Sequence, residues 1–155
     1  MVQDTLSDVL RAVRLRGAVF FNISGSSDWV AEAPASKEIA PLLMPGVEHV
    51  IEYHAVARGR CWAGIPEGPW VQLGEGDVVL FPHGDAHVVA GAPRLRGSGD
   101  FAWLSELRAE DYPLQVAYDG AQPIHWSPPA DAADATLVCG FLGCDLRPFN
   151  PLFGA

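Results

Sequence analysis

The sequence predicts an all-β domain that folds as a sandwich or barrel. Short apolar runs recur about every ten residues, and clusters of Gly, Pro, Asp and Ser separate them. No long helical pattern alternates with these runs, which argues against a parallel α/β sheet. A chain of 155 residues suits one core of useful size, so we expect a single domain over 1–155.

The first predicted element is a short N-terminal helix over residues 5–15. Apolar residues recur between Leu6 and Val13 at the three- and four-residue spacing of one helical face. Gly17 follows as a natural stop, because glycine tolerates the backbone conformation at a helix end. We therefore expect this helix to pack outside the β domain.

After the helix, the pattern predicts a barrel over 18–142 and a C-terminal connector over 143–155. The candidate strands are residues 18–23, 28–33, 48–57, 60–65, 69–73, 77–81, 86–90, 101–105, 114–118 and 136–142. Two stretches interrupt the rhythm. Residues 91–100 form a polar, Gly-rich loop, and residues 119–135, rich in Pro, Ala and Asp, are expected to form a long excursion.

Composition excludes several classes of protein. The chain is 49% hydrophobic and 19% charged, which is typical of a globular domain. Its net charge of −9 argues against nucleic-acid binding by this chain, since such affinity comes mostly from Lys and Arg on phosphates. No apolar stretch is long enough to cross a membrane, and no secretory signal is present. Three cysteines without a CxxC pair indicate reduced thiols and a cytoplasmic location.

The most informative stretch is GDVVLFPHGDAHVVAG. Gly76 and Asp77 can turn the chain into a strand, and Pro82 ends ladder pairing because it donates no N–H. Gly84 permits a tight turn with positive φ, and His87 then begins the next strand. The spacing G-x5-P-x-G-x2-H resembles the second motif of the cupin superfamily.

The first cupin motif, G-x5-H-x-H-x3-4-E-x6-G, survives only in its second half. The segment EYHAVARG places Glu52 seven residues before Gly59, as the motif requires. The paired histidines are absent, and His49 lies nearby but out of register. His54 shares a face with Glu52, because both are even positions on one predicted strand.

Further segments narrow the resemblance. LSDVLRAVRLRGAVFF, GRCW, LGEGDVVLFPHGDAHVV and TLVCGF occur in this order and look like the N-terminal cupin domain of AraC-type transcriptional regulators, over about residues 5–153. NPLF resembles the start of the connector that leads, in that family, to a helix-turn-helix domain. The resemblance implies a double-stranded β-helix, or jelly-roll barrel, that senses a small molecule or mediates dimerisation. No pair of helices with a recognition-helix pattern follows, so we expect no direct nucleic-acid contact by this chain.

Four residues are candidates for a ligand pocket: Glu52, His54, Trp62 and His87. A small β-barrel leaves an interior able to hold one ligand, and Trp62 would either line it or pack in the core. Glu52, His54 and His87 could instead converge on zinc or another divalent metal, with Cys139 as a conceivable sulfur donor. The alternative is that the histidines hydrogen-bond internally and Cys139 is a small buried hydrophobe. Gly59, Gly76, Asp77, Pro82 and Gly84 are expected to shape the backbone.

Three functions compete on this evidence. They are a sensory or regulatory domain without catalysis, a metal-dependent cupin enzyme of the isomerase or dioxygenase type, and an interaction module with a vestigial pocket. The missing histidine pair favours the first and third. We therefore expect a non-catalytic domain without a required cofactor that responds to an unidentified small-molecule effector, with the metalloenzyme as the alternative.

Self-association is also expected. Phe149, Leu152 and Phe153 lie beyond the last predicted strand and need burial, each worth about 1.5–3 kcal/mol if fully removed from water. They could fold back on their own barrel or meet a partner. Regulators of the resembled type generally act as dimers, so we expect a homodimer, with no membrane partner.

Overall fold

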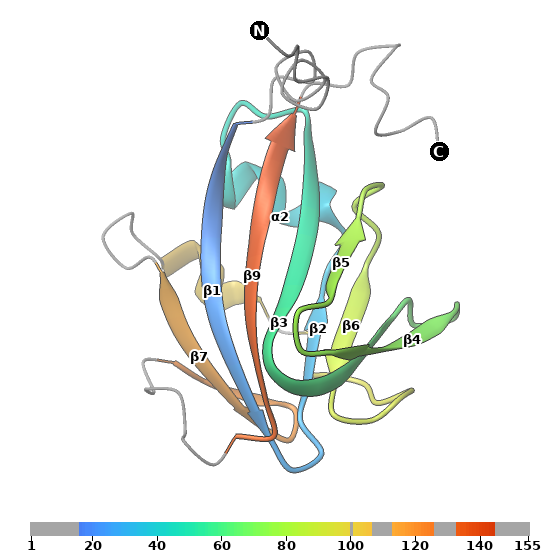
Figure 1. Ribbon diagram of the computed structural model, residues 1–155. Coiled ribbons are helices and arrows are strands. Elements are labelled where there is room, and N and C mark those ends of the chain that lie inside the picture. Colours follow the sequence, from blue (N-terminus) through green and yellow to red (C-terminus); the bar gives the residue numbers. More distant parts are fainter. Residues whose placement is uncertain (1–15, 100, 107–112, 126–132, 145–155) are drawn as a thin grey trace, which may run out of the picture.

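The longest strand, β3 (His49–Gly64), connects the two halves of the fold. The computed structural model describes residues 16–99, 101–106, 113–125 and 133–144. Its sheet runs in the order β2-β6-β3-β9-β1-β7-β8, with β4 and β5 also paired to β3. Figure 1 shows this sheet curling into a nearly closed barrel. The prediction of an all-β fold is confirmed, whereas the helix predicted at 5–15 and the connector beyond residue 144 lie outside the described residues.

The remaining elements follow the chain closely. They are β1 (Arg16–Ser26), β2 (Val30–Ala33), α2 (Ser36–Leu43), β4 (Trp70–Gly74), β5 (Val78–Phe81), β6 (His87–Ala90), a 3-10 helix η1 (Ala102–Glu106), β7 (Leu114–Asp119), β8 (Gln122–His125) and β9 (Ala135–Cys144). β1 and β7 pair in parallel, and the other pairs are antiparallel.

A bend in β3 divides the sheet into two parts. The pairing register between β3 and β9 shifts between Val56 and Arg58, and Gly59 has a positive φ of 79°. A bulge of this kind turns a strand and increases its twist. The first part of β3 pairs with β5 and β9, and the last part pairs with β4 and β6. The predicted strands 48–57 and 60–65 are therefore one bent strand.

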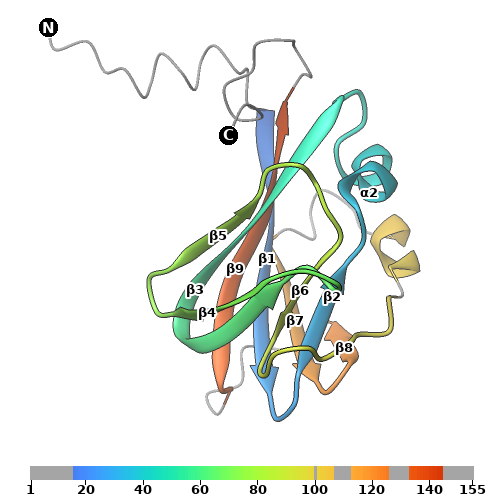
Figure 2. The same cartoon turned by 90° about the vertical axis from the view of Figure 1, so that its right-hand side faces the viewer.

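Three segments differ from the sequence-based prediction. Helix α2 was not predicted, because prolines surround it and Pro41 lies inside it. It forms where Ile39 and Ala40 become buried, since tertiary packing stabilises short helices that propensity alone does not. Figure 2 shows α2 and η1 on the same side of the barrel.

The other two differences are local. The predicted strand 101–105 is the 3-10 helix η1, in which the Ser105 hydroxyl donates to the carbonyl of Ala102 at 2.7 Å. The predicted excursion 119–135 contains β8, which pairs with β7 through a tight turn at Gly120. Pro123 is tolerated in β8 because this strand ends the sheet path and needs no second partner.

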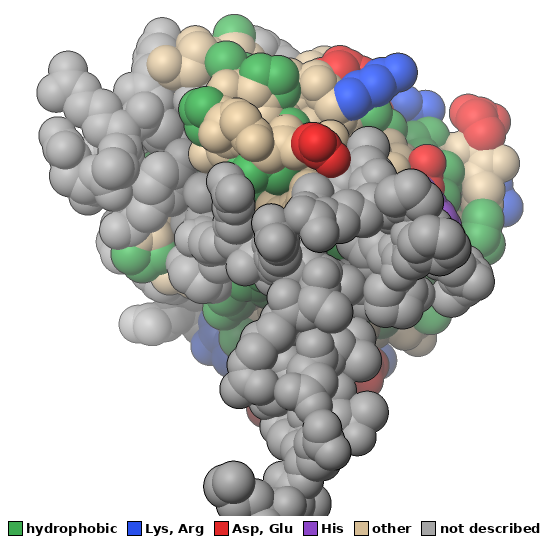
Figure 3. Space-filling model, turned by 90° about the horizontal axis from the view of Figure 1, so that it is seen from above, with side chains coloured by type: hydrophobic (Ala, Val, Ile, Leu, Met, Phe, Trp, Pro, Cys, Tyr) green, Lys and Arg blue, Asp and Glu red, His purple; other side chains and the backbone are tan. Residues whose placement is uncertain are grey.

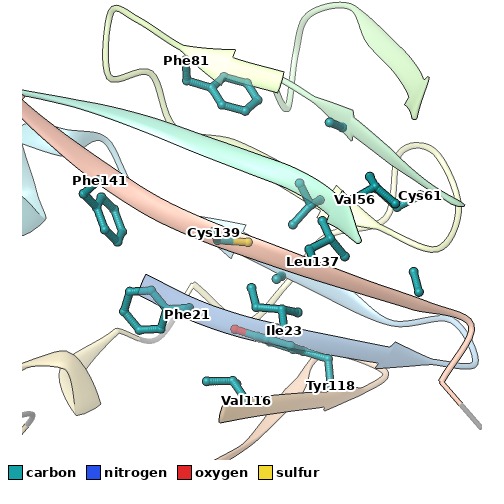
Figure 4. Close-up of a cluster of buried hydrophobic side chains, with 14 of the residues drawn as sticks. Phe21, Ile23, Val56, Cys61, Phe81, Val116, Tyr118, Leu137, Cys139 and Phe141 are labelled. Atoms are coloured by element: carbon teal, nitrogen blue, oxygen red, sulfur yellow. The ribbon is translucent and has the colours of Figure 1, made fainter. Parts of the chain in front are cut away.

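The barrel interior is an aromatic and aliphatic core. Alternate residues of β1, β7 and β9 point inward, as the two-residue period of a strand requires. Figure 4 shows this cluster, which includes Phe21, Ile23, Val116, Tyr118, Leu137, Cys139 and Phe141. The rings of Phe21 and Phe141 meet edge to face, with centroids 5.7 Å apart. All three cysteines are free and buried.

The outer surface is mixed in character. Figure 3 shows hydrophobic, acidic and basic side chains side by side on the described surface at the end of the molecule seen from above. No helix within the described ranges is long and apolar enough to span a membrane.

Candidate functional site

Three buried polar residues meet inside the barrel. Glu52 and His54 lie two positions apart on β3, so both side chains point to the inner face of the strand. β5 and β9 flank them: Glu52 lies opposite Phe81 and Phe141, and His54 lies opposite Val79 and Cys139. Their exposed fractions are only 2% and 6%. Polar groups this deeply buried need partners, because desolvation is costly.

His87 reaches the same place from β6. It is fully buried and directly follows the turn that Pro82 and Gly84 shape. Gly84 has a φ of 68°, as the sequence predicted for this turn. The His87 Nδ1–H donates to the carbonyl of Asp85 at 2.9 Å, which fixes the direction of the ring. The ring of Phe81 stacks on His87, with centroids 3.7 Å apart.

The distances between the three side chains are short. His54 Nε2 lies 2.7 Å from His87 Nε2, and His87 Nε2 lies 3.6 Å from Glu52 Oε2. Glu52, His54 and His87 form the one group of three or more potential metal-ligating side chains found among the described residues. One ligand atom from each side chain lies within 4.8 Å of the others. The structure therefore brings together three of the predicted pocket residues, and we call them the buried triad.

Proton positions in the buried triad follow from these contacts. His87 uses its Nδ1–H for Asp85, so a neutral His87 presents a lone pair at Nε2. His54 must then donate its Nε2–H across the 2.7 Å contact. His54 Nδ1 is left without a hydrogen-bond partner among the described residues. The Ser36 hydroxyl donates to Glu52 Oε1 at 3.1 Å.

Burial keeps the buried triad uncharged near neutral pH. Desolvation raises the pKa of Glu52 to about 8, against the opposing effect of the Ser36 hydrogen bond. Desolvation lowers the pKa of His87 to about 4, although the Asp85 carbonyl works in the other direction. The pKa of His54 falls well below its usual value, first through burial and then through the neighbouring His87. At pH 7 the site therefore holds two neutral imidazoles and a mostly protonated carboxyl group.

The buried triad borders a cavity of about 70 Å³. Most of the wall is aromatic or aliphatic, and its members are Phe21, Ile23, Ala31, Ala33, Pro34, Ile39, Val89, Phe101, Trp103, Val116, Tyr118, Cys139 and Phe141. Glu32 also lines the cavity and accepts hydrogen bonds from Arg96 and from the backbone N–H of Gly97. The lining contains no Lys or Arg. Such a space suits a small apolar molecule with few polar atoms.

Other predicted residues take different places. Trp62 is not among the residues that line the cavity. Cys139 lies on the cavity wall, and burial raises the pKa of its thiol, but it is not part of the triad. Gly59 and Gly76 both have positive φ, and the Asp77 carboxylate accepts the N–H of Gly74 at 2.8 Å.

Sequence reasoning missed two contributors. Ser36 holds Glu52 from a helix that the sequence did not predict. Trp103 lines the cavity from η1 and meets Phe21 edge to face, with centroids 6.1 Å apart. Neither position carries a local motif, and both depend on how distant segments pack.

Comparisons with known proteins follow this geometry. The family model described as Cupin matches residues 4–155. A solved cupin domain of an XRE family transcriptional regulator from Enterobacter cloacae shares 13% identity at a TM-score of 0.34, over 79% of this chain and 75% of that one. An HTH_3 family transcriptional regulator from Vibrio cholerae shares 13% identity at a TM-score of 0.29, over 61% of this chain. The match covers 30% of the Vibrio cholerae chain. No curated protein matches.

Proposed function

The chain belongs to the cupin family, and we propose that it is a non-catalytic, small-molecule-sensing domain of a transcriptional regulator of the AraC type. The observation that carries this proposal is the interior cavity, whose wall is apolar except for Glu32 and the buried triad. Convergent polar groups in an apolar pocket are the usual design of a small-molecule site. The AraC assignment rests on the order of sequence segments described above.

The effector is expected to be small and largely apolar. A ligand that carries a carboxylate or phosphate would meet no Lys or Arg on the cavity wall. Burial of such a charge without a partner is costly. A hydroxyl or amine could instead hydrogen-bond to the buried triad while its apolar part contacts Phe21, Trp103 or Phe141.

Thermal denaturation with a panel of compounds tests this function. We would screen short-chain alcohols and monocyclic aromatic compounds that bear one hydroxyl or amino group, with EDTA present to remove metal. A true effector at one hundred times its Kd should stabilise the fold by about 2.7 kcal/mol. The compound should be recovered unchanged after incubation.

A matched pair of variants locates the binding. Val116→Phe fills the cavity, because Val116 is buried on its wall. Val78→Phe adds the same bulk to a side chain that is 54% exposed on β5. Ligand-induced stabilisation should vanish in the first variant and persist in the second. Stabilisation that survives in Val116→Phe would place the ligand elsewhere and reject the proposal.

The second candidate is a metal-dependent cupin enzyme. The specific observation in its favour is that Glu52, His54 and His87 present potential ligand atoms at one point beside the cavity. A metalloenzyme would consume a compound that stabilises it, and the sensing domain would not. Product analysis after incubation with a stabilising compound and added metal therefore separates the two functions.

A further inference from the structure

We propose that Glu52, His54 and His87 bind one divalent transition-metal ion, with His54 supplying the ligand that the absent histidine pair of the first motif cannot. This goes beyond the sensing function and does not depend on it. The usual motif places its histidines before the glutamate, whereas His54 follows Glu52 by two residues on the same strand. The site would thus use a rearranged ligand set.

The spacing of the three atoms suits a single small cation. Imidazole nitrogen and carboxylate oxygen lie about 2.0–2.2 Å from zinc, so two such atoms on one ion lie roughly 2.9–3.5 Å apart. His54 Nε2 and His87 Nε2 are separated by 2.7 Å, and His87 Nε2 and Glu52 Oε2 by 3.6 Å. Movements of a few tenths of an ångström would satisfy both separations.

The surrounding contacts orient two of the ligands. The carbonyl of Asp85 holds Nδ1–H of His87, which leaves the Nε2 lone pair directed at the triad. Ser36 holds one oxygen of Glu52, and the other oxygen faces His87. Outer hydrogen bonds of this kind fix the tautomer and direction of metal ligands. The chain therefore already has the supporting contacts that a metal site requires.

The position of His54 explains how the chain can dispense with the histidine pair. Glu52 and His54 share the inner face of β3, and His87 approaches from β6. All three are buried, with His54 the most exposed at 6%. Two imidazoles and one carboxylate make a donor set suited to zinc, iron and related ions. Three protein ligands leave coordination positions for a water or for an effector in the adjoining cavity.

Calorimetric titration of the whole chain with Zn²⁺, after treatment with chelator, tests the site. We expect one equivalent of zinc per chain. His54→Ala and His87→Ala should each weaken zinc binding on the order of 10–100-fold or more. His49→Ala is the matched control, because His49 contacts the carbonyl of Pro82 and does not line the cavity. Its zinc affinity should equal that of the parent.

His54→Gln guards against loss of fold, since glutamine is polar and of similar size. Circular dichroism and thermal melting would establish that this variant is folded, and its zinc affinity should fall as it does in His54→Ala. Zinc affinity that is unchanged in a folded His54 variant, or the absence of stoichiometric binding in the parent, would overturn the proposal. Neither result would bear on the sensing function, because effector binding is measured with EDTA present.

Discussion

Gly84 shows how much one backbone position contributes to this site. Its φ of 68° lies in the left-handed region, which residues with a Cβ rarely adopt. A Cβ there would also come within 2.7 Å of both Cβ and Oγ of Ser36. Because Ser36 holds Glu52, the turn before His87 is linked to the far side of the buried triad. The motif glycine therefore supports two of the three polar residues.

Replacing this glycine should cost stability in two ways. We predict that Gly84→Val lowers the free energy of unfolding by roughly 1–3 kcal/mol from backbone strain, plus a further loss from the collision with Ser36. Gly76→Val is the control, since Gly76 also has positive φ but nothing lies within 4 Å of its Cβ position. Urea denaturation should show the larger loss at Gly84. Equal losses at both positions would mean that the Ser36 contact is absent.

A second prediction concerns Ser36 itself. Ser36→Ala removes the hydroxyl that donates to Glu52 Oε1, and it leaves a buried oxygen without that donor. The expected loss of unfolding free energy is about 1–3 kcal/mol. Ser105→Ala, at an exposed hydroxyl that caps a turn of η1, should cost less. A Ser36→Ala variant that is as stable as the parent in chemical denaturation would contradict this assignment.

At this scale the sequence revealed what is local in the chain. Pro82, Gly84 and His87 are close together, so their spacing alone predicted the turn and the strand start. The contact between Ser36 and Glu52 joins residues sixteen positions apart in different elements, and no local pattern signals it. For the same reason, tryptophan content could not show that Trp103 lines the cavity and Trp62 does not.

Among the elements, β3 has the largest influence on the site. Its bulge and the positive φ of Gly59 let one strand serve both parts of the sheet. The first part carries Glu52 and His54, and the second part pairs with β6, which carries His87. The bend therefore brings residues of β3 and β6 to the same interior point.

Gly59→Ala should disturb that bend. An added Cβ would be strained at a φ of 79° and would collide with the backbone carbonyl of Asp134. We predict a loss of roughly 1–3 kcal/mol or more in unfolding free energy. Gly99→Ala has a similar φ of 64° with open space around its Cβ, and it should lose less. Guanidinium denaturation of both variants gives the comparison, and equal losses would remove the bend from this account.

Element prediction succeeded where the strand pattern was strong and failed where packing decided. The runs at β4, β5, β6, β7 and β9 fall within a few residues of the predicted strands. α2 was missed because Pro41 and its neighbours signal loop, while burial of Ile39 and Ala40 makes the helix stable. β8 was missed although Asp119 and Gly120 carry a hairpin signal, because the surrounding Pro and Ala suggested a loop.

At the scale of the whole molecule, the chain is expected to self-associate. Three apolar side chains on β4 and β5, those of Val71, Val78 and Leu80, are about half exposed. Contiguous apolar surface of this kind marks association sites in many proteins. Light scattering at micromolar concentration should give twice the chain mass of 16.6 kDa. A clean monomer would reject the dimer.

Two further samples locate the dimer interface. Deletion of residues 148–155 should dissociate the dimer if the C-terminal apolar residues hold it. Leu80→Lys should dissociate it if the interface is on the barrel, because a lysine at a half-exposed position would bring a charge into an apolar contact. A dimer that survives both changes would exclude these two surfaces.

The central claim is that Glu52, His54 and His87 meet as neutral groups inside the barrel. Long-range ¹H–¹⁵N NMR of the histidine rings in metal-free protein at pH 7 tests it most directly. We predict opposite neutral tautomers, with the proton of His54 on Nε2 and that of His87 on Nδ1, while exposed His83 titrates freely as an internal reference. Imidazolium signals from His54 and His87 at pH 7, or the same tautomer for both rings, would contradict the account.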